Sequence, residues 1–253
     1  MHKEELISGF ILAVVLGILL AYSPDSLSGG IVIIMAIIVA ISFFFGIVKM
    51  MRYNYAFIIA MKSIDRIKNT NSDDVWLSME QQEDFFWNNE LDKKFKEYRV
   101  KVSKLRDSKY EIVPDIDTVV DEDYIYIKTW KNVITNVPNM LTGLGILGTF
   151  LGLLLGITGI NLTSQEVIIT SIGTLLNGIR LAFYTSISGV IVSMLFNIIY
   201  SYFWNVTMRN MEAFYEKYHR YIIPSQEEIL KNNKENFYRK VRERLEKIEN
   251  KIQ

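Results

Sequence analysis

Hydroxyl side chains are the polar groups that recur within two long apolar stretches of this sequence. The stretches cover Val137–Ile160 and about Val167–Trp204, and apart from Arg180 they contain no charged residue and no histidine. A hydroxyl can hold water or a proton carrier by hydrogen bonds, but it does not titrate near neutral pH. If the chain conducts ions, the titrating carboxylate must therefore belong to another polypeptide. The hydroxyl-bearing residues concerned are Thr142, Thr149, Thr185, Ser186, Ser188 and Ser193.

The same hydroxyls also fit a purely structural interpretation. Serine and threonine in helices commonly donate to the carbonyl group four residues earlier, and their small size suits a tight helix interface. Composition alone favours this packing interpretation over a polar lining.

Other kinds of chemistry have little support in the sequence. The absence of cysteine excludes disulfides, thiolate catalysis and cysteine-ligated metals. The two histidines, His2 and His219, lie far apart in polar regions. The acidic run Asp115–Asp123 lacks the glycine-centred spacing of an EF-hand loop, so we interpret it as a solvated connector. We therefore expect no enzyme, no metal site and no cofactor, and a net charge of zero gives no reason to expect direct nucleic-acid binding.

Arg180 is the one charged residue within the second apolar stretch. A charge at membrane depth is a functional candidate by default. Alternatively, the long arginine side chain can extend to the outer interface and place its charge in water. We expect Arg180 to be either an intramembrane charge or a charge at the membrane rim.

Four glycines mark the stretch around which we expect the membrane part to assemble. Gly145, Gly148, Gly152 and Gly156 follow one another at helical spacing and share one helix face. In a soluble helix each would cost about 1 kcal/mol relative to alanine. In lipid, small residues let neighbouring backbones approach closely, which is how membrane helices gain packing energy.

The apolar runs predict an all-α fold, a polytopic helical membrane protein with four transmembrane helices. Leu6–Tyr22 and Ile31–Val48 form the first hairpin, and the first run lacks a signal-peptide cleavage site, so we interpret it as a retained helix. The predicted segments are a transmembrane hairpin at 1–48, a cytoplasmic helical domain at 49–131, pore-lining helices 3 and 4 at 132–208 and a cytoplasmic helical tail at 209–253.

The third helix is expected to begin near Trp130. The fourth begins near Val167 or Ile172 and ends at about Trp204, and a short connector around Asn161–Glu166 faces outward. The turn at 23–30 has no lysine or arginine, whereas 49–131 has fifteen and the part after Trp204 has eleven. The positive-inside rule therefore predicts that both termini and the large loop are cytoplasmic. That the membrane is a bacterial inner membrane is what the family resemblance described below implies.

The segment at 49–131 carries its own helical pattern. A helix over Tyr55–Ile67 continues out of the membrane, and a second helix follows the turn NTNSDD. Large side chains recur at helical spacing in this second helix: Phe85, Phe86, Trp87, Leu91, Phe95, Tyr98, Val102 and Leu105. In the tail, residues 237–252 carry about two heptads of apolar positions and suggest the start of a coiled coil.

The third and fourth helices resemble the pore-lining pair of the MotA/TolQ/ExbB proton-channel family. The family signature G-x-x-G-T-x-x-G matches Gly145, Gly148, Thr149 and Gly152. The second family pattern, G-I-x-E-A-L-x-x-T-x-x-G, aligns on Gly178, Ile179, Ala182 and Gly189. In that register Ser186 stands at the family's threonine, Leu181 stands where relatives have glutamate, and no proline follows Ser186.

Within this family, the chain most resembles the ZorA subunits of Zorya anti-phage systems. The similarity lies in the stretches VPNMLTGLGILGTFLGL and AFYTSISG and in the helical tail. It implies a homopentameric stator that surrounds two copies of a single-helix partner of the MotB, ExbD or ZorB kind, whose aspartate carries H⁺ or Na⁺. Thr149 and Ser186 would line the ion pathway, with Thr185 as the alternative. The glycines that would permit helix packing are Gly145, Gly148, Gly152 and Gly189.

Three other functions remain open on the sequence. A flagellar-type or TolQ/ExbB-type stator would use the same helices in another energy-transducing role. A membrane-anchored scaffold would act through its tail, although an anchor has no need of a helix pair rich in glycine and threonine. A solute carrier would need a broken helix or an intramembrane charge pair, and Arg180 has no acidic mate in the membrane.

Overall fold

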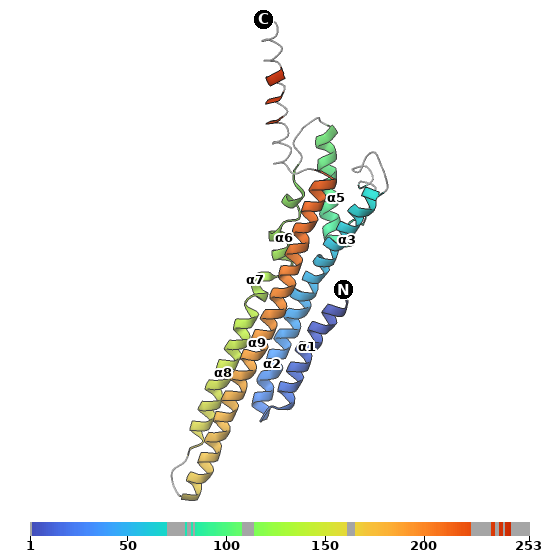
Figure 1. Cartoon of the computed structure of the whole chain (residues 1–253). Helices are drawn as coiled ribbons and strands as arrows, with labels where there is room; N and C mark the ends of the chain where they lie inside the picture. Colours follow the sequence, from blue (N-terminus) through green and yellow to red (C-terminus); the bar gives the residue numbers. More distant parts are fainter. Residues whose placement is uncertain are drawn as a thin grey trace. The chain divides into compact units, whose positions relative to one another are not determined.

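The computed structural model of the chain is all-α over the residues that it describes (Figure 1). These residues are 2–69, 79, 82, 84–107, 114–160, 165–223, 234–235, 238–239 and 241–243. The helices are α1 (His2–Ala21), α2 (Ser26–Ser42), the π-helix η1 (Phe43–Val48), α3 (Lys49–Asn69), α5 (Asn89–Asp107), the 3₁₀-helix η2 (Ile116–Thr118), α6 (Glu122–Lys128), α7 (Lys131–Ile134), α8 (Val137–Thr158) and α9 (Gln165–Tyr221).

The chain divides into two compact units, each built from separate parts of the sequence. Unit 1 combines Met1–Arg52 with Ile125–Thr207, and unit 2 combines Tyr53–Tyr124 with Met208–Gln253. The segment boundaries drawn from the sequence remain predictions.

Unit 1 is a bundle in which α2 packs against both α1 and α8. Asp25 starts α2, because its carboxylate accepts the Ser28 N–H at 2.8 Å and the Ser28 hydroxyl lies within reach of the Asp25 N–H. Large apolar side chains fill the centre of the bundle, among them Met35, Ile47, Leu141, Val192 and Phe196. The bundle core is therefore made by residues from two separate parts of the sequence, within 1–52 and 125–207.

Three described helices are long and apolar enough to cross a membrane: Ser26–Lys68, Lys131–Thr158 and Val167–Tyr221. They indicate a multi-pass membrane protein. The remaining apolar helix, Leu6–Ala21, is shorter. At about 1.5 Å per residue it spans about 24 Å, less than the roughly 30 Å of bilayer hydrocarbon. The expected count of four transmembrane helices is thus supported for three, and the first stays a prediction.

Unit 2 is held together by aromatic rings. The Phe85 and Phe95 rings stack with centroids 4.6 Å apart, and Phe86 lies edge-on to Phe214 at 5.2 Å. Phe57 adds a ring from α3, 6.2 Å from Phe86. The cluster therefore joins α3, the segment before α5, α5 itself and the last turns of α9.

Two helix boundaries differ from the expectation. Phe85, Phe86 and Trp87 precede α5, which begins at Asn89. The Asp92 carboxylate accepts the N–H groups of Phe86 and Asn88 at 2.7 and 2.8 Å, so these groups bond to a side chain and not along a helix. The predicted coiled coil at 237–252 and the connector predicted around Asn161–Glu166 lie largely outside the described residues, and α9 begins at Gln165.

The third membrane helix also starts differently, because a break divides it into α7 and α8. Trp130 precedes α7 in the left-handed region at φ 54°, and α7 ends at Ile134. Pro138 then opens α8, where its missing N–H costs no intrahelical bond. The helix expected from Trp130 onward is therefore a short turn followed by the membrane helix.

Candidate functional site

The interface between α8 and α9 gathers most of the residues that the sequence singled out. Gly145, Gly148, Gly152 and Gly156 are all buried on one face of α8. We call the line along which they meet α9 the seam. Figure 1 shows the two helices running together.

At the seam the two backbones come into direct contact. A methyl group added at Gly152 would lie 2.6 Å from the carbonyl oxygen of Gly178, and one added at Gly178 would overlap the Gly152 carbonyl oxygen. A methyl group at Gly189 would lie 2.8 Å from the Leu141 carbonyl oxygen. Because these neighbours are backbone atoms, they cannot move aside as a flexible side chain can. The seam therefore requires glycine on both helices at these levels.

Thr149 bonds to both helices of the seam. Its half-buried hydroxyl lies 3.1 Å from the Gly145 carbonyl oxygen, four residues earlier, and 3.2 Å from the Ala182 carbonyl oxygen of α9. One hydroxyl has a single proton to share between these two acceptors. Thr149 thus has the back-bonding geometry of a packing residue and also a position at the edge of the seam.

Thr185 and Ser186 occupy different positions. Thr185 is fully buried, its hydroxyl donates to the Leu181 carbonyl oxygen at 3.0 Å, and its side chain fills the space beside Gly148 where a methyl group would overlap it. Ser186 is half-buried, and its hydroxyl has no hydrogen-bond partner among the described residues. The geometry therefore gives Thr185 a packing position and leaves Ser186 able to bond a group outside this chain.

Two further hydroxyls of α9 bond within unit 1. Ser188 donates to the Tyr184 carbonyl oxygen at 2.8 Å, and Ser193 donates to the Pro138 carbonyl oxygen of α8 at 2.9 Å. Apart from Arg180, the stretches 137–160 and 167–204, which form α8 and most of α9 within unit 1, contain no charged residue and no histidine. Among the described residues, no group of three His, Asp or Glu side chains could hold a metal ion.

Two tyrosines of α9 were missed by the sequence reasoning. The Tyr184 hydroxyl donates to the Leu19 carbonyl oxygen and so ties α9 to α1. The Tyr200 hydroxyl is buried and has no hydrogen-bond partner among the described residues. The sequence could have indicated these two residues, because each tyrosine lies within an apolar run and a buried tyrosine hydroxyl needs a hydrogen-bond partner.

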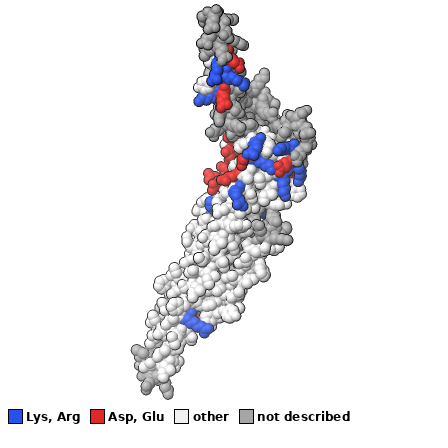
Figure 2. Space-filling view, in the orientation of Figure 1, with Lys and Arg blue, Asp and Glu red and all other residues white. Residues whose placement is uncertain are grey.

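Arg180 is exposed on α9, outside the seam, although it follows the buried Gly178 by two residues. In the sequence, Arg180 is the one Lys or Arg between Lys131 and Arg209. Figure 2 shows an isolated basic patch on a largely uncharged stretch of the surface. The structure thus gives Arg180 no place at the helix contact itself.

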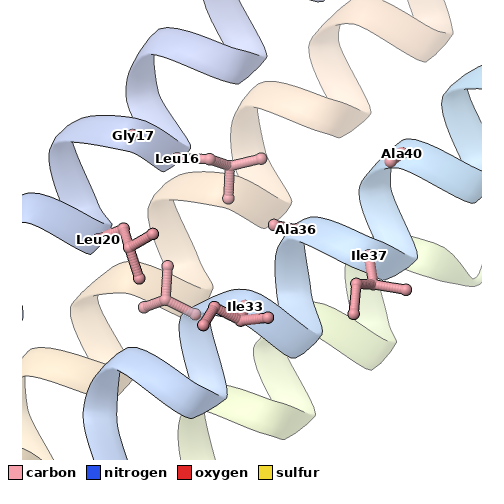
Figure 3. A pocket seen from close by; sticks show the side chains of 8 residues that line it. Leu16, Gly17, Leu20, Ile33, Ala36, Ile37 and Ala40 are labelled. Carbon is pink, nitrogen blue, oxygen red and sulfur yellow. The ribbon is translucent and has the colours of Figure 1, made fainter. Parts of the chain in front are cut away.

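An apolar groove of about 310 Å³ lies between α1 and α2 (Figure 3). Its lining combines small residues, such as Gly17, Ala36 and Ala40, with branched ones. Such a surface suits contact with lipid chains or another membrane helix. It offers no group that could bind or carry an ion, so the seam remains the candidate site.

Comparison with known proteins identifies the family. A family model described as "Anti-phage protein ZorA, Zorya type I system" matches residues 19–221, which include α2, α8 and all of α9. The chain belongs to this ZorA-like family. The resemblance to ZorA subunits that the sequence indicated is thereby confirmed. The matching family is that of ZorA proteins from Zorya type I systems.

A curated relative adds a shorter match. The Zorya protein ZorA of Escherichia coli is 37% identical over 82 residues, which cover 29% of this chain and 14% of the relative. The chain thus corresponds to a small part of that protein's length.

Proposed function

We propose that this chain is the ring-forming subunit of an ion-driven membrane motor in anti-phage defence. Five copies would surround two copies of a single-helix partner, and the partner's aspartate would carry H⁺ or Na⁺. Membership of the ZorA-like family supports the defence role and implies partners within the Zorya system. The observation that carries the motor role is the seam, a backbone-tight helix pair that has hydroxyls at its edge and no titratable group of its own.

The seam supports this proposal because it is rigid and yet lacks a group that could carry an ion. Contact between Gly152 and the Gly178 backbone fixes the two helices as one wall. Thr149 and Ser186 would present their hydroxyls to the partner helix, with Thr185 holding the wall together from within. A hydroxyl can hydrogen-bond to an aspartate in either protonation state, as acceptor or donor, without changing its own charge. Ion capture and release would then depend on the partner's carboxylate.

The lengths of the helices support a rim position for Arg180. Lys131 Nζ lies 3.5 Å from the centre of the Trp204 ring, and aromatic and basic side chains together are typical of a cytoplasmic membrane interface. From Trp204 to Arg180, α9 rises about 36 Å at 1.5 Å per residue. That rise covers the roughly 30 Å of bilayer hydrocarbon. Arg180 would therefore sit at the outer interface, with both termini in the cytoplasm of a bacterial cell.

The proposal is tested by the mass of the complex extracted in detergent, with and without a co-expressed single-helix protein encoded beside this chain. We expect a pentameric ring that captures two copies of the partner. A monomer or dimer indifferent to any partner would contradict the motor and favour a membrane-anchored scaffold. A ring that binds only a flagellar-type or TolQ/ExbB-type partner would retain the motor and change its biological role.

A further inference from the structure

Unit 2 carries a groove that combines basic and aromatic side chains. The groove has a volume of about 390 Å³ and lies between α3 and the segment that precedes α5. Exposed Lys62 and Arg66 line it from α3, and the exposed ring of Trp87 closes the other side. The full lining is Tyr55, Ile59, Lys62, Ser63, Arg66, Gln82, Asp84 and Trp87. Tryptophan, tyrosine and arginine are the residues most enriched at the energetic centres of protein interfaces.

Trp87 is held in this position at a conformational cost. Its φ is 52°, in the left-handed region, and its side chain is 76% exposed. The Asp92 carboxylate accepts the N–H groups on both sides of Trp87, from Phe86 and Asn88. A bulky residue in this region costs about 1–3 kcal/mol and persists only where the surroundings impose it. The turn therefore holds a large ring on the surface. Because the ring is exposed, it contributes little buried area to the folding of unit 2.

A second surface of unit 2 has the opposite charge. The segment from Asp115 to Asp123 holds five carboxylates and no lysine or arginine. Asp117, Glu122 and Asp123 are exposed, while Ile116 and Val120 are buried and anchor the segment. We call this segment the acidic ridge. Figure 2 shows acidic and basic side chains gathering at different places on the surface of unit 2.

The acidic ridge is fixed in shape by the rest of unit 2. Lys94 donates to the Val119 carbonyl oxygen at 3.1 Å, and Tyr215 donates to the Val120 carbonyl oxygen. Asp121 accepts the Tyr124 N–H at 2.8 Å and so caps α6. The exposed carboxylates thus project from a scaffold that needs no ordering before it binds, which lowers the entropic cost of association.

We propose that the acidic ridge of one copy of this chain docks in the basic groove of the next copy. The proposal rests on the ring assembly proposed above. A closed ring needs two different complementary surfaces on each subunit, because its contacts are head-to-tail. The groove and the ridge supply such a pair, with Lys62 and Arg66 facing Asp117, Glu122 and Asp123, and with Trp87 as the apolar anchor. Asp84 also lines the groove, which therefore carries two basic side chains and one acidic one.

A second copy fits the groove because this chain itself supplies a matching acidic surface. Asp65, the acidic residue of α3 nearest to Lys62 and Arg66 in sequence, pairs with Lys217 at 2.6 Å. Asp65 therefore pairs with a lysine that does not line the groove. Opposite charges on the two surfaces would also fix the order of subunits around the ring, since two grooves or two ridges repel each other.

Cross-linking between two differently tagged full-length copies tests the contact directly. The chain has no cysteine, so each introduced thiol is the only one on its copy. One copy carries Lys62→Cys, the other carries Asp123→Cys, and both are treated with a short flexible bis-maleimide. We expect a product that contains both tags. Lys96→Cys in place of Lys62→Cys is the matched control, because Lys96 is an exposed lysine of unit 2 outside the groove.

Charge reversal gives an independent readout on the same complex. Lys62→Glu with Arg66→Glu should remove the cross-subunit contact and shift the extracted complex to smaller species. Adding Asp117→Lys with Asp123→Lys should restore the larger complex. The pair Lys96→Glu and Lys101→Glu, which changes the same number of exposed charges, should leave the complex unchanged.

The outcomes separate this proposal from the motor itself. A ring of normal mass with no cross-link, and no response to charge reversal, overturns the docking contact and leaves the motor standing. A wild-type chain that forms no ring overturns both. Capture of a different acidic protein by the groove, without a two-tag product, overturns the second copy as its occupant.

Discussion

The closest helix contacts in the two units of this chain are made by opposite kinds of residue. Along the seam of unit 1, glycines remove side chains so that backbone meets backbone, as between Gly152 and Gly178. In unit 2, large rings such as Phe86 and Phe214 fill the space between helices. The difference fits the membrane location proposed for unit 1: in water, burying rings gains hydrophobic free energy, whereas in lipid, helices gain most from close contact. Substitutions should therefore fail for opposite reasons in the two units.

Truncation of a core ring in unit 2 should have the largest effect on stability. Phe214 is fully buried and contacts Phe57, Phe85 and Phe86. Phe214→Ala should lower the free energy of unfolding by about 3–5 kcal/mol, because it removes buried area and leaves a cavity. Chemical unfolding of the detergent-solubilised protein measures the loss. Val100→Ala is the control, since Val100 is exposed and should change stability little; an equal loss there would mean that the ring cluster is not the core.

High pH should destabilise unit 2 through Tyr98. Burial, with the nearby charges of Asp115 and Asp117, raises the pKa of Tyr98 to about 12. A group whose pKa is raised by folding stabilises the folded state below its unfolded pKa of about 10 and loses that contribution as pH rises toward 12. The loss amounts to about 3 kcal/mol at most. Unfolding free energies at about pH 8 and about pH 11 measure this fall.

Tyr98→Phe isolates this titration from other alkaline effects. The variant should lose about 1 kcal/mol at neutral pH, since the Tyr98 hydroxyl no longer donates to the Pro114 carbonyl oxygen. Its stability should then fall less steeply with pH than that of the wild type. Exposed Tyr55 provides the control, and a profile altered equally by Tyr55→Phe would contradict the assignment.

Adding a single methyl group at the seam should also be destabilising. Gly152→Ala places a methyl group 2.6 Å from a backbone oxygen of α9, so the helices must separate. We expect a loss of about 1–3 kcal/mol, typical of overpacking, together with loss of the assembled complex. Gly143→Ala is the matched control on the same helix, because Gly143 has no atom within 4 Å of the added methyl group. Equal tolerance of both variants would show that the seam is not tightly packed.

Removal of the seam hydroxyls should affect stability least and ion flow most. Thr149→Ala and Ser186→Ala should each change stability by well under 1 kcal/mol, since hydrogen bonds between membrane helices average about 0.6 kcal/mol. Ion uptake should nevertheless be abolished while the complex keeps its mass. Thr149→Ser retains the hydroxyl and should conduct. Normal uptake by both alanine variants would show that Thr149 and Ser186 serve only helix packing.

The sequence was informative where a single physical rule decides the structure. Glycine spacing predicted one face of the third membrane helix, and Gly145, Gly148, Gly152 and Gly156 are all buried on one face of α8. Apolar length predicted three of the long helices. Both signals are periodic and local, so they survive without knowledge of the tertiary contacts.

The sequence was uninformative where side chains compete with the backbone. Asp92 draws the N–H groups of Phe86 and Asn88 away from a helix, and this choice depends on a bond formed across the turn. Within the π-helix η1, Gly46 leaves room for the Ile134 side chain, a contact between residues far apart in sequence that no local pattern predicts. The sequence also could not decide which of Thr185 and Ser186 is buried at the contact with α8. The two residues are adjacent and lie about 100° apart around the helix, so either could face α8.

The most direct test of the central claim is ion uptake into lipid vesicles that contain the purified complex. We predict uptake when this chain and its single-helix partner are present, loss of uptake when the partner's membrane aspartate is changed to asparagine, and no uptake by this chain alone. Uptake by this chain alone would contradict the claim that the seam lacks the ion-carrying group. Absence of uptake by a complete complex of the expected mass would contradict the motor itself.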